Sequence, residues 1–258
     1  MKPDYGIDAP GVVRNLFLFA ALGLGVWATA ATGLWSGLLD VSIGSVRFHL
    51  PLAPTGLGSG FGTFLMACWM LWESRVGKLR GRERLLDRVA WRGDERVLDV
   101  GCGRGLMLVG AAKRLTTGRA VGIDIWQSVD LSGNNAPAAI ENARREGVAG
   151  RVSVQTADMR RMPFADGSFD VVVSRAAIHN VYDAADRAKA LAEIARVLKP
   201  GGTAILDDIR HQGEYVSVLA RHGCPGARSC GSRLVRWLLA IVTAGSLAPG
   251  TVIARKPG

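Results

Sequence analysis

The sequence predicts an α/β fold in which a mostly parallel sheet carries helices on both faces, preceded by two transmembrane helices. Three observations carry this prediction. Short apolar segments alternate with helix-forming segments from residue 96 onward, a turn with three alternating glycines follows the first of them, and two long uncharged stretches precede residue 75. A chain of 258 residues is long enough for one domain of ordinary size plus a smaller part.

Residues 1–74 are predicted to form a membrane hairpin, with spans at about 16–39 and 55–72. Neither span contains a charged residue, and ~20 apolar residues suffice to cross a bilayer. Small residues four positions apart let helices approach closely in lipid, and they occur as Gly33 with Gly37, Gly56 with Gly60, and Gly58 with Gly62. The alternatives are a pair of buried helices or, for the first stretch, a signal peptide, although no cleavage signature follows it.

Lysine and arginine residues set the expected orientation of this hairpin. Two of them precede the first span, one lies between the spans, and five follow closely after the second: Arg75, Lys78, Arg80, Arg82 and Arg84. Positively charged flanks stay on the cytoplasmic side, so both chain ends are expected in the cytoplasm. The expected localisation is therefore a multi-pass membrane protein with two spans and a cytoplasmic domain.

Residues 75–95 are predicted to form a basic juxtamembrane helix. From Glu73 to Arg92 there are seven basic and three acidic residues, and the whole chain has a formal net charge of +10. Such charge fits nucleic acid or an anionic membrane surface. We favour the membrane surface and expect no nucleic acid, because only Trp91 interleaves an aromatic ring with the basic residues. An ordinary solvated helix face is the alternative.

Residues 96–258 are predicted to form the α/β domain. Strands are expected at 96–100, 119–124, 151–155, 168–174, 202–207 and 251–255, and helices at about 104–115, 136–147, 183–199 and 213–222. Alternation of this kind places ligands beyond the carboxyl ends of the strands. The apolar stretch 234–247 is expected to be a core element or, alternatively, a flap over the site.

The first of these strands leads directly into the glycine turn Asp99-Val100-Gly101-Cys102-Gly103-Arg104-Gly105. A strand, a glycine turn and a helix present backbone N–H groups to a nucleotide-like ligand, as in Rossmann-like sheets. The third glycine comes one residue earlier than in a dinucleotide fingerprint. The carboxylate of Asp99 suits a ligand with a positive charge better than a pyrophosphate.

The segment Val97 to Gly105, V-L-D-V-G-C-G-R-G, resembles the first motif of the class I S-adenosylmethionine (SAM) methyltransferases. Two further segments are similar to later motifs of that family: M-P-F-A-D-G-S-F-D-V-V at 162–172 and V-L-K-P-G-G at 197–202. The resemblance implies SAM as the cofactor. It also implies that Gly101, Cys102, Gly103 and Gly105 pack on the amino-acid end of SAM, where Asp99 helps to hold it.

The resemblance extends to the ends of the next strands. Asp124 ends the second strand and is expected to accept both ribose hydroxyls, with Ile125 beside it; capping of a loop is the alternative role. Asp158 stands where the family's acidic residue meets the adenine amino group, and Met159 follows it. These residues and Ser174, at the end of the fourth strand, complete the expected cofactor site.

The segment from Ser174 to Tyr182 is expected to face the transferable methyl group. His179 and Tyr182 are its candidate catalytic residues, and His179 is expected to orient or deprotonate the acceptor. A hydrogen-bonded histidine at a strand-to-helix junction is the alternative. Asp207 and Asp208 end the fifth strand, and the sequence assigns a role to neither of them.

The four cysteines do not resemble a disulfide framework. Cys224 and Cys230, near His222, lack the C-x-x-C spacing of a zinc site, so no metal is expected.

The soluble part is most similar to the branch of the family that methylates small molecules, including quinone precursors and sterols. Joined to a membrane hairpin, it implies transfer of the SAM methyl group to a small lipophilic acceptor by in-line displacement. The alternatives are a methyltransferase acting on protein or nucleic acid at the membrane, and a SAM-binding membrane protein without turnover.

Overall fold

The computed structural model describes residues 2–231, 234, 237, 239, 241, 243 and 247–258. The chain forms two compact units. One contains Met1–Tyr5, Leu79–Ser128 and Gly133–Gly258, and the other contains Gly6–Lys78 and Val129–Ser132. We call them the sheet unit and the helical hairpin unit.

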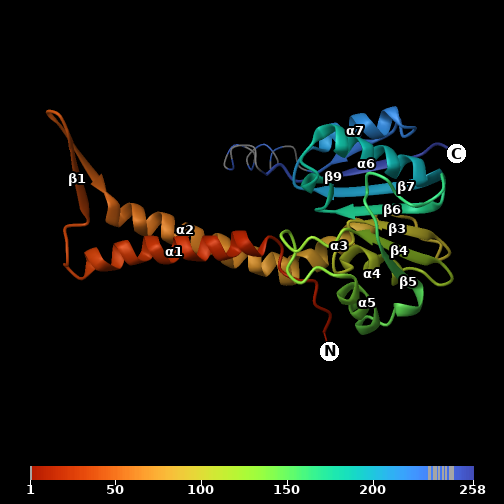
Figure 1. Cartoon of the computed structure of the whole chain (residues 1–258), viewed down its shortest axis with the longest axis horizontal. Helices are drawn as coiled ribbons and strands as arrows, with labels where there is room; N and C mark the ends of the chain where they lie inside the picture. Colours follow the sequence, from red (N-terminus) through yellow and green to blue (C-terminus); the bar gives the residue numbers. More distant parts are fainter. Residues whose placement is uncertain are drawn as a thin grey trace. The chain divides into compact units, whose positions relative to one another are not determined.

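The sheet unit is built on a seven-stranded sheet with the order β5-β4-β3-β6-β7-β9-β8 (Figure 1). Strands β3 to β7 run parallel, and β9 and β8 add an antiparallel edge. The strands are β3 (Arg96–Val100), β4 (Arg119–Asp124), β5 (Val152–Thr156), β6 (Phe169–Arg175), β7 (Leu198–Asp208), β8 (Arg228–Cys230) and β9 (Gly250–Arg255). The strand order reverses between β3 and β6, which is where ligands bind in open α/β sheets.

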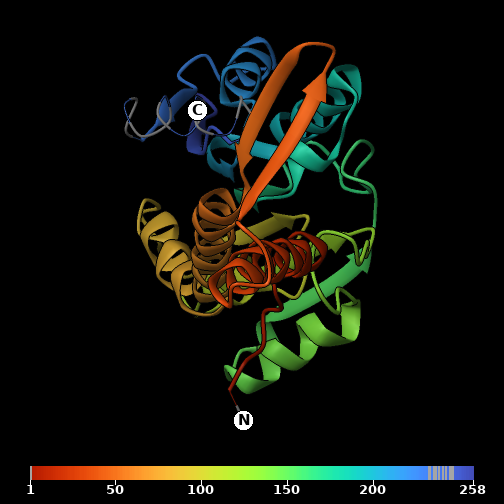
Figure 2. The same cartoon turned by 90° about the vertical axis from the view of Figure 1, so that its left-hand side faces the viewer.

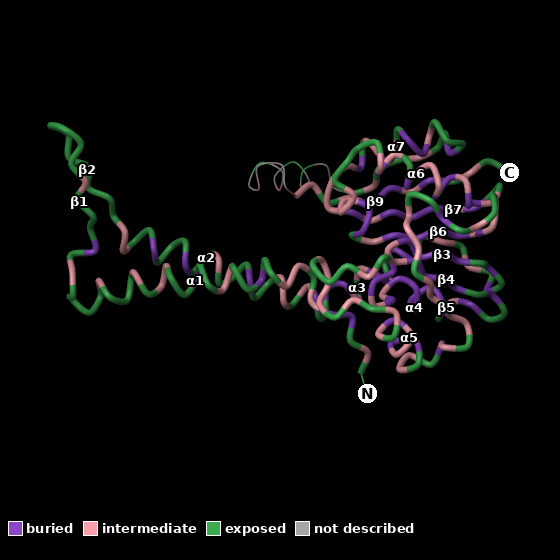
Figure 3. Tube along the Cα trace, in the orientation of Figure 1, coloured by how far each residue is buried: buried purple, intermediate pink, exposed green. Residues whose placement is uncertain are grey.

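Helices cover both faces of this sheet. Alternate residues of β3 point to opposite sides: Leu98 and Val100 pack with α6 (Ala184–Val197) and α7 (Gln212–Arg221). Val97 packs on the other side with α3 (Lys78–Leu86), α4 (Leu106–Ala112) and α5 (Ala136–Arg145). Figure 3 shows the central strands buried along their length. The predicted mostly parallel α/β fold is confirmed.

Three features differ from the sequence prediction. The three-residue strand β8 was not predicted, and β7 begins at Leu198, four residues earlier than expected, because Leu198 pairs with Phe169 ahead of a shift in register. Residues 75–95, expected to be one helix, contain the end of a π-helical segment (Glu73–Gly77) and then α3. Most of the predicted apolar element 234–247 lies outside the described residues.

The helical hairpin unit consists of α1 (Pro10–Ala31) and α2 (Leu52–Trp72), which lie side by side (Figure 1). They are joined by the strands β1 (Leu38–Ile43) and β2 (Val46–Pro51), which form an antiparallel two-stranded sheet that Figure 2 shows as a projecting ribbon. Lys78, which begins α3 and belongs to this unit, is buried. Its Nζ donates to the carbonyl oxygen of Gly6 at 2.7 Å and pairs with Asp8 at 3.1 Å. This lysine fixes the segment before α1 to the segment that follows α2.

The two helices meet through glycine. A Cβ atom added to Gly23 would lie 2.7 Å from the carbonyl oxygen of Gly56, and one added to Gly60 would lie 2.8 Å from the backbone nitrogen of Leu24. The predicted pair Gly56 and Gly60 therefore does lie at the helix contact. The other two predicted pairs do not act as pairs: Gly58 and Gly62 face open space, and Gly33 and Gly37 follow the end of α1 with positive φ, where only Gly37 is close to α2, at Ala53.

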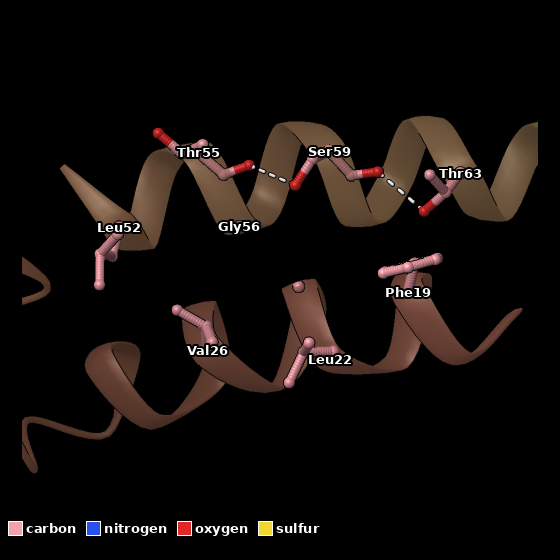
Figure 4. A pocket seen from close by; sticks show the side chains of 9 residues that line it. Phe19, Leu22, Val26, Leu52, Thr55, Gly56, Ser59 and Thr63 are labelled. Atoms are coloured by element: carbon pink, nitrogen blue, oxygen red, sulfur yellow. Dashed lines mark hydrogen bonds between the residues drawn. The ribbon is translucent and has the colours of Figure 1, made fainter. Parts of the chain in front are cut away.

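A shallow apolar groove runs beside this contact (Figure 4). The hydroxyls of Ser59 and Thr63 line it, but they donate to the backbone carbonyls of Thr55 and Ser59 at 2.7 and 2.8 Å. With their protons used inside the helix, these hydroxyls leave the groove apolar in character.

Within the described residues, one helix is long and apolar enough to cross a membrane. It is Pro10–Ala31, with 22 residues and a mean hydropathy of 1.6 in its most apolar window. The second predicted span does not meet that criterion, although α2 has 21 residues. Its first half is rich in glycine, serine and threonine, which contribute little hydropathy, so the prediction of two membrane-spanning helices is not supported.

Candidate functional site

The glycine turn lies at the carboxyl end of β3, next to the point where the strand order reverses. Gly101, Gly103 and Gly105 have φ values of +72°, +51° and +85°, which residues with a Cβ atom rarely adopt. A Cβ on Gly101 would collide with the side chain of Ala177, which follows β6. The turn after β3 and the turn after β6 are thus in direct contact.

Asp99 lies beneath this turn and is buried, with 1% of its surface exposed. Its Oδ2 accepts a hydrogen bond from the Leu108 backbone N–H at 2.8 Å, while Oδ1 has no partner within the described part of the chain. Burial raises the pKa of Asp99 to about 8, the Leu108 N–H opposes this, and the nearby Asp124 adds to it. A cationic ligand would satisfy this carboxyl group.

Asp124, at the end of β4, is tied to the glycine turn. Its Oδ2 accepts from the Gly103 N–H at 2.8 Å, and its Oδ1 accepts from the Trp126 N–H at 2.6 Å. Ile125, between them, is 50% exposed although it is apolar. An acceptor and an exposed apolar side chain at one strand end match the polar ribose and the flat base of a nucleoside.

Asp158 forms an ion pair that the sequence analysis missed. Arg160 donates to both of its carboxylate oxygens and also pairs with Asp186 at 2.6 Å. These hydrogen bonds from Arg160 lower the pKa of Asp158. The neighbouring Met159 packs on the core, and its Cε lies 3.7 Å from the position that a Cβ on Gly101 would occupy.

His179 is held by a buried carboxylate at the end of β7. Its Nδ1 lies 2.5 Å from Asp208 Oδ1, and its backbone N–H donates to Oδ2 at 3.1 Å. Asp208 also accepts from the Ile209 N–H at 2.8 Å and from the Tyr215 hydroxyl at 2.9 Å. Burial, followed by the charge of Asp208, raises the pKa of Tyr215, so its hydroxyl stays a donor.

The sequence left the role of Asp208 open and did not single out Tyr215. The only signal was one tyrosine on the apolar face of a predicted amphipathic helix. By contrast, Tyr182 was predicted to be catalytic, and the structure places its side chain on the surface with 86% exposed.

Ser174 and Cys102 are both buried next to the turns. The Ser174 hydroxyl donates to the carbonyl oxygen of Val100 at 2.8 Å, which joins the ends of β6 and β3. Burial raises the pKa of the Cys102 thiol well above its usual range, and the nearby Asp99 and Asp124 add to this effect. The thiol is therefore protonated and acts as a small packing group.

Arg104, inside the glycine turn, is bound by the amino-terminal segment of the sheet unit. Its Nε donates to the carbonyl oxygen of Asp4 at 2.8 Å, and its Nη2 pairs with the Asp4 carboxylate at 2.7 Å. Asn142 holds both partners, because its Nδ2 donates to the carbonyl oxygens of Asp4 and Arg104 at 2.7 and 2.9 Å. This contact was not predictable from the sequence, since it joins positions a hundred residues apart.

Strained backbone gathers at the same edge of the sheet. Of the non-glycine residues with positive φ in the described ranges, Trp126, Ala176 and His211 follow the carboxyl ends of β4, β6 and β7. Such conformations cost about 1–3 kcal/mol each and persist where the surroundings enforce them, commonly at binding sites.

Cys224 and Cys230 do not join a metal cluster: no group of three potential ligands occurs among the residues that the structure describes.

Residues 98–206 match the family model described as a methyltransferase domain. The chain is 36% identical over 134 residues to methyltransferase GfsG of Streptomyces halstedii, covering 52% of this chain and 45% of that one. It is 33% identical over 125 residues to the ubiquinone/menaquinone biosynthesis C-methyltransferase UbiE of Geotalea daltonii, covering 48% and 50%. The chain thus spans about half the length of these curated relatives.

Solved structures share the fold. The geranyl diphosphate C-methyltransferase of Streptomyces coelicolor, solved with Mg²⁺, geranyl diphosphate and S-adenosyl-L-homocysteine, superimposes with a TM-score of 0.53 at 18% identity. The match covers 69% of this chain and 78% of that one. Residues 98–206 are therefore a methyltransferase domain, and S-adenosyl-L-methionine is its cofactor.

Proposed function

We propose that the whole protein is a membrane-anchored methyltransferase that acts on a small lipophilic acceptor. The observation that carries this proposal is the packing of α1 and α2, which is the reverse of the packing expected for two helices in water. Small residues face the helix contact, whereas large apolar side chains such as Leu22, Phe61 and Trp69 are exposed. Helices in water bury large apolar residues, whereas helices in lipid pack through small ones.

The helical hairpin enters the bilayer as a pair in this proposal. Helix α1 supplies the hydropathy of a span, and α2, which is less apolar, accompanies it by packing on its glycine surface. The Lys and Arg residues after α2 keep both chain ends and the methyltransferase domain in the cytoplasm, next to anionic lipid.

The cofactor is held by the residues at the carboxyl ends of β3, β4 and β5. Asp99 faces the charged amino-acid end, the turn from Gly101 to Gly105 offers bare backbone, and Asp124 accepts from the ribose hydroxyls. Ile125 and Met159 provide apolar contact for the base, and Asp158 accepts from its amino group. When bound, SAM supplies a methyl group on a positively charged sulfur atom, which is a good leaving group.

His179 is the general base of this proposal. With Nδ1 directed to Asp208, the other ring nitrogen, Nε2, takes a proton from the acceptor as the methyl group arrives. Asp208 fixes the tautomer, and Tyr215 fixes Asp208. Acceptors that lose a proton on methylation, such as phenols and acidic carbon atoms, fit this arrangement. Support also comes from the C-methyltransferase activity named for the UbiE relative.

The test supplies membranes containing the protein with SAM labelled in its methyl group and then partitions the products. Label in the organic phase, lost in the Asp124→Ala variant, is the expected result. Label only in protein or nucleic acid would refute the small lipophilic acceptor. Label in neither, from a protein that binds SAM by calorimetry, would indicate a SAM-binding protein without turnover.

A further inference from the structure

The strands β1 and β2 form a β-hairpin with two chemically different faces. Three cross-strand pairs on one face are entirely apolar: Leu39 with Leu50, Val41 with Phe48, and Ile43 with Val46. On the other face Asp40 pairs with His49, and Ser42 lies opposite Arg47. Apart from Leu38 and Pro51, which pair with each other on the second face, alternation along both strands therefore separates apolar from polar side chains.

The apolar face has no cover in the helical hairpin unit. Leu39, Ile43, Val46, Phe48 and Leu50 are all exposed. A two-stranded sheet is marginally stable in water, so a bare apolar face of this kind needs a partner.

The position of the β-hairpin relative to the helices fixes its depth in a membrane. Helix α1 has 22 residues and is about 33 Å long, which matches the hydrocarbon thickness of a bilayer. The β-hairpin begins seven residues after α1 ends, and α2 begins directly after Pro51. A bilayer that contains α1 must place the β-hairpin at the surface opposite the start of α1.

Backbone hydrogen bonding excludes a deeper position. The sheet contains β1 and β2 alone, so the outer edges of both strands present unpaired N–H and C=O groups. Such edges are too costly for the hydrocarbon core but are readily hydrated among lipid headgroups. On the polar face, His49 Nδ1 lies 2.6 Å from Asp40 Oδ1, and Arg47 carries a positive charge that suits lipid phosphates.

We infer that the β-hairpin lies flat in the distal membrane surface, with its apolar face on the acyl chains and Arg47 among the lipid phosphates. Its partner is therefore the lipid monolayer at the end of α1, opposite the monolayer at its start. This inference rests on the proposed membrane anchor. The hairpin acts as a stop that keeps the short, glycine-rich α2 from sliding out of register with α1.

The test uses the full chain in phosphatidylcholine vesicles that carry a carbene precursor at one of two depths on the acyl chain. One lipid has it near the carbonyl group and the other near the terminal methyl group. Labelled peptides are mapped by mass spectrometry. We expect the first lipid to label residues 39–50 and the second to leave them unlabelled, while α1 is labelled by both.

Adjacent substitutions on opposite faces provide the matched comparison. Val41→Glu puts a charge on the apolar face and should lower labelling of the β-hairpin about fivefold, whereas Ser42→Glu, on the polar face, should change it less than about twofold. An unlabelled β-hairpin in a chain whose α1 is labelled overturns the inference. If that chain is also a dimer that Val41→Glu dissociates, a second copy covers the face instead. Absence of label from α1 as well would contradict the membrane anchor itself.

Discussion

At the scale of single residues, Asp99 is the group whose protonation state should change when SAM binds. It is buried, one of its oxygen atoms has no partner in the described structure, and Asp124 places a second carboxylate nearby. With a pKa of about 8, the free domain holds Asp99 protonated at neutral pH. Between the unfolded pKa near 3.9 and this value, the folded state binds more protons, so Asp99 lowers stability as pH rises through that window.

A cationic ligand beside Asp99 should reverse this state. SAM carries an ammonium group and a sulfonium, and either charge favours the ionised carboxylate, so binding at pH 7 should release close to one proton. Calorimetric titration in two buffers of different ionisation enthalpy measures the number released. In Asp99→Asn the release should vanish. Equal proton release by the variant and the natural protein would show that another group titrates.

Substitutions of His179 and Asp208 should affect kcat separately from the affinity for SAM. His179→Ala should lower kcat by about a hundredfold or more, while SAM affinity changes less than about twofold. Asp208→Asn keeps the shape of the side chain but removes the negative charge that faces His179, so it should lower kcat by about tenfold or more while SAM affinity changes less than about twofold. A purely structural role for Asp208 would weaken SAM binding together with kcat.

Tyr182→Phe tests the other predicted catalytic residue. Because Tyr182 lies on the surface, we expect less than about a twofold effect on kcat.

At the scale of elements, the sequence predicts the bounds of a strand best where the residues of that strand and the turn after it are sufficient to define them. Strands β3 and β4 were predicted with their observed bounds, because a short apolar run ends in a glycine turn or in Asp124. The contact between His179, Asp208 and Tyr215 was not predictable, since three elements must fold before it exists. The β-hairpin was not predicted for another reason: its first two residues lie inside the predicted span 16–39, and its other residues only separate two uncharged stretches.

Glycine at the α1–α2 contact gives a prediction at this scale. Gly60→Leu places a side chain against the backbone of α1, and overpacking of this kind typically costs about 1–3 kcal/mol. Backbone amides of α2 should therefore exchange hydrogen faster in lipid vesicles. Gly58→Leu, two residues away and facing open space, is the matched control and should leave exchange unchanged. Equal exchange in both variants would contradict the observed helix contact.

At the scale of the whole molecule, the chain passes between the sheet unit and the helical hairpin unit more than once. Tyr5 belongs to the sheet unit, where its hydroxyl donates to Glu146 and accepts from Arg82, while Lys113 pairs with Glu146 at 2.7 Å. Burial alone would raise the pKa of Glu146, but hydrogen bonds from Lys113, Tyr5 and Arg82 lower it to about 2. Its stabilising contribution is therefore complete above the unfolded pKa near 4.3 and is lost as pH falls toward 2.

This cluster decides how the sheet unit can be separated from the helical hairpin unit. A chain that starts at Leu79 loses Tyr5 and exposes the pair between Arg82 and Glu146. A chain in which a glycine-serine linker of about ten residues replaces 6–78 retains Tyr5, and its ends can be joined because Tyr5 reaches Arg82.

Both chains should be free of the membrane and bind SAM, but the linked chain should be more stable. We expect a difference of about 1–3 kcal/mol in the free energy of unfolding by urea at pH 7, from the lost hydrogen bonds and burial of Tyr5. The difference should shrink as the pH falls from 5 toward 2, because Glu146 becomes protonated. Tyr5→Phe in the linked chain isolates the hydroxyl. If the linked chain fails to fold, residues 6–78 supply part of the domain's core, and the helical hairpin is more than an anchor.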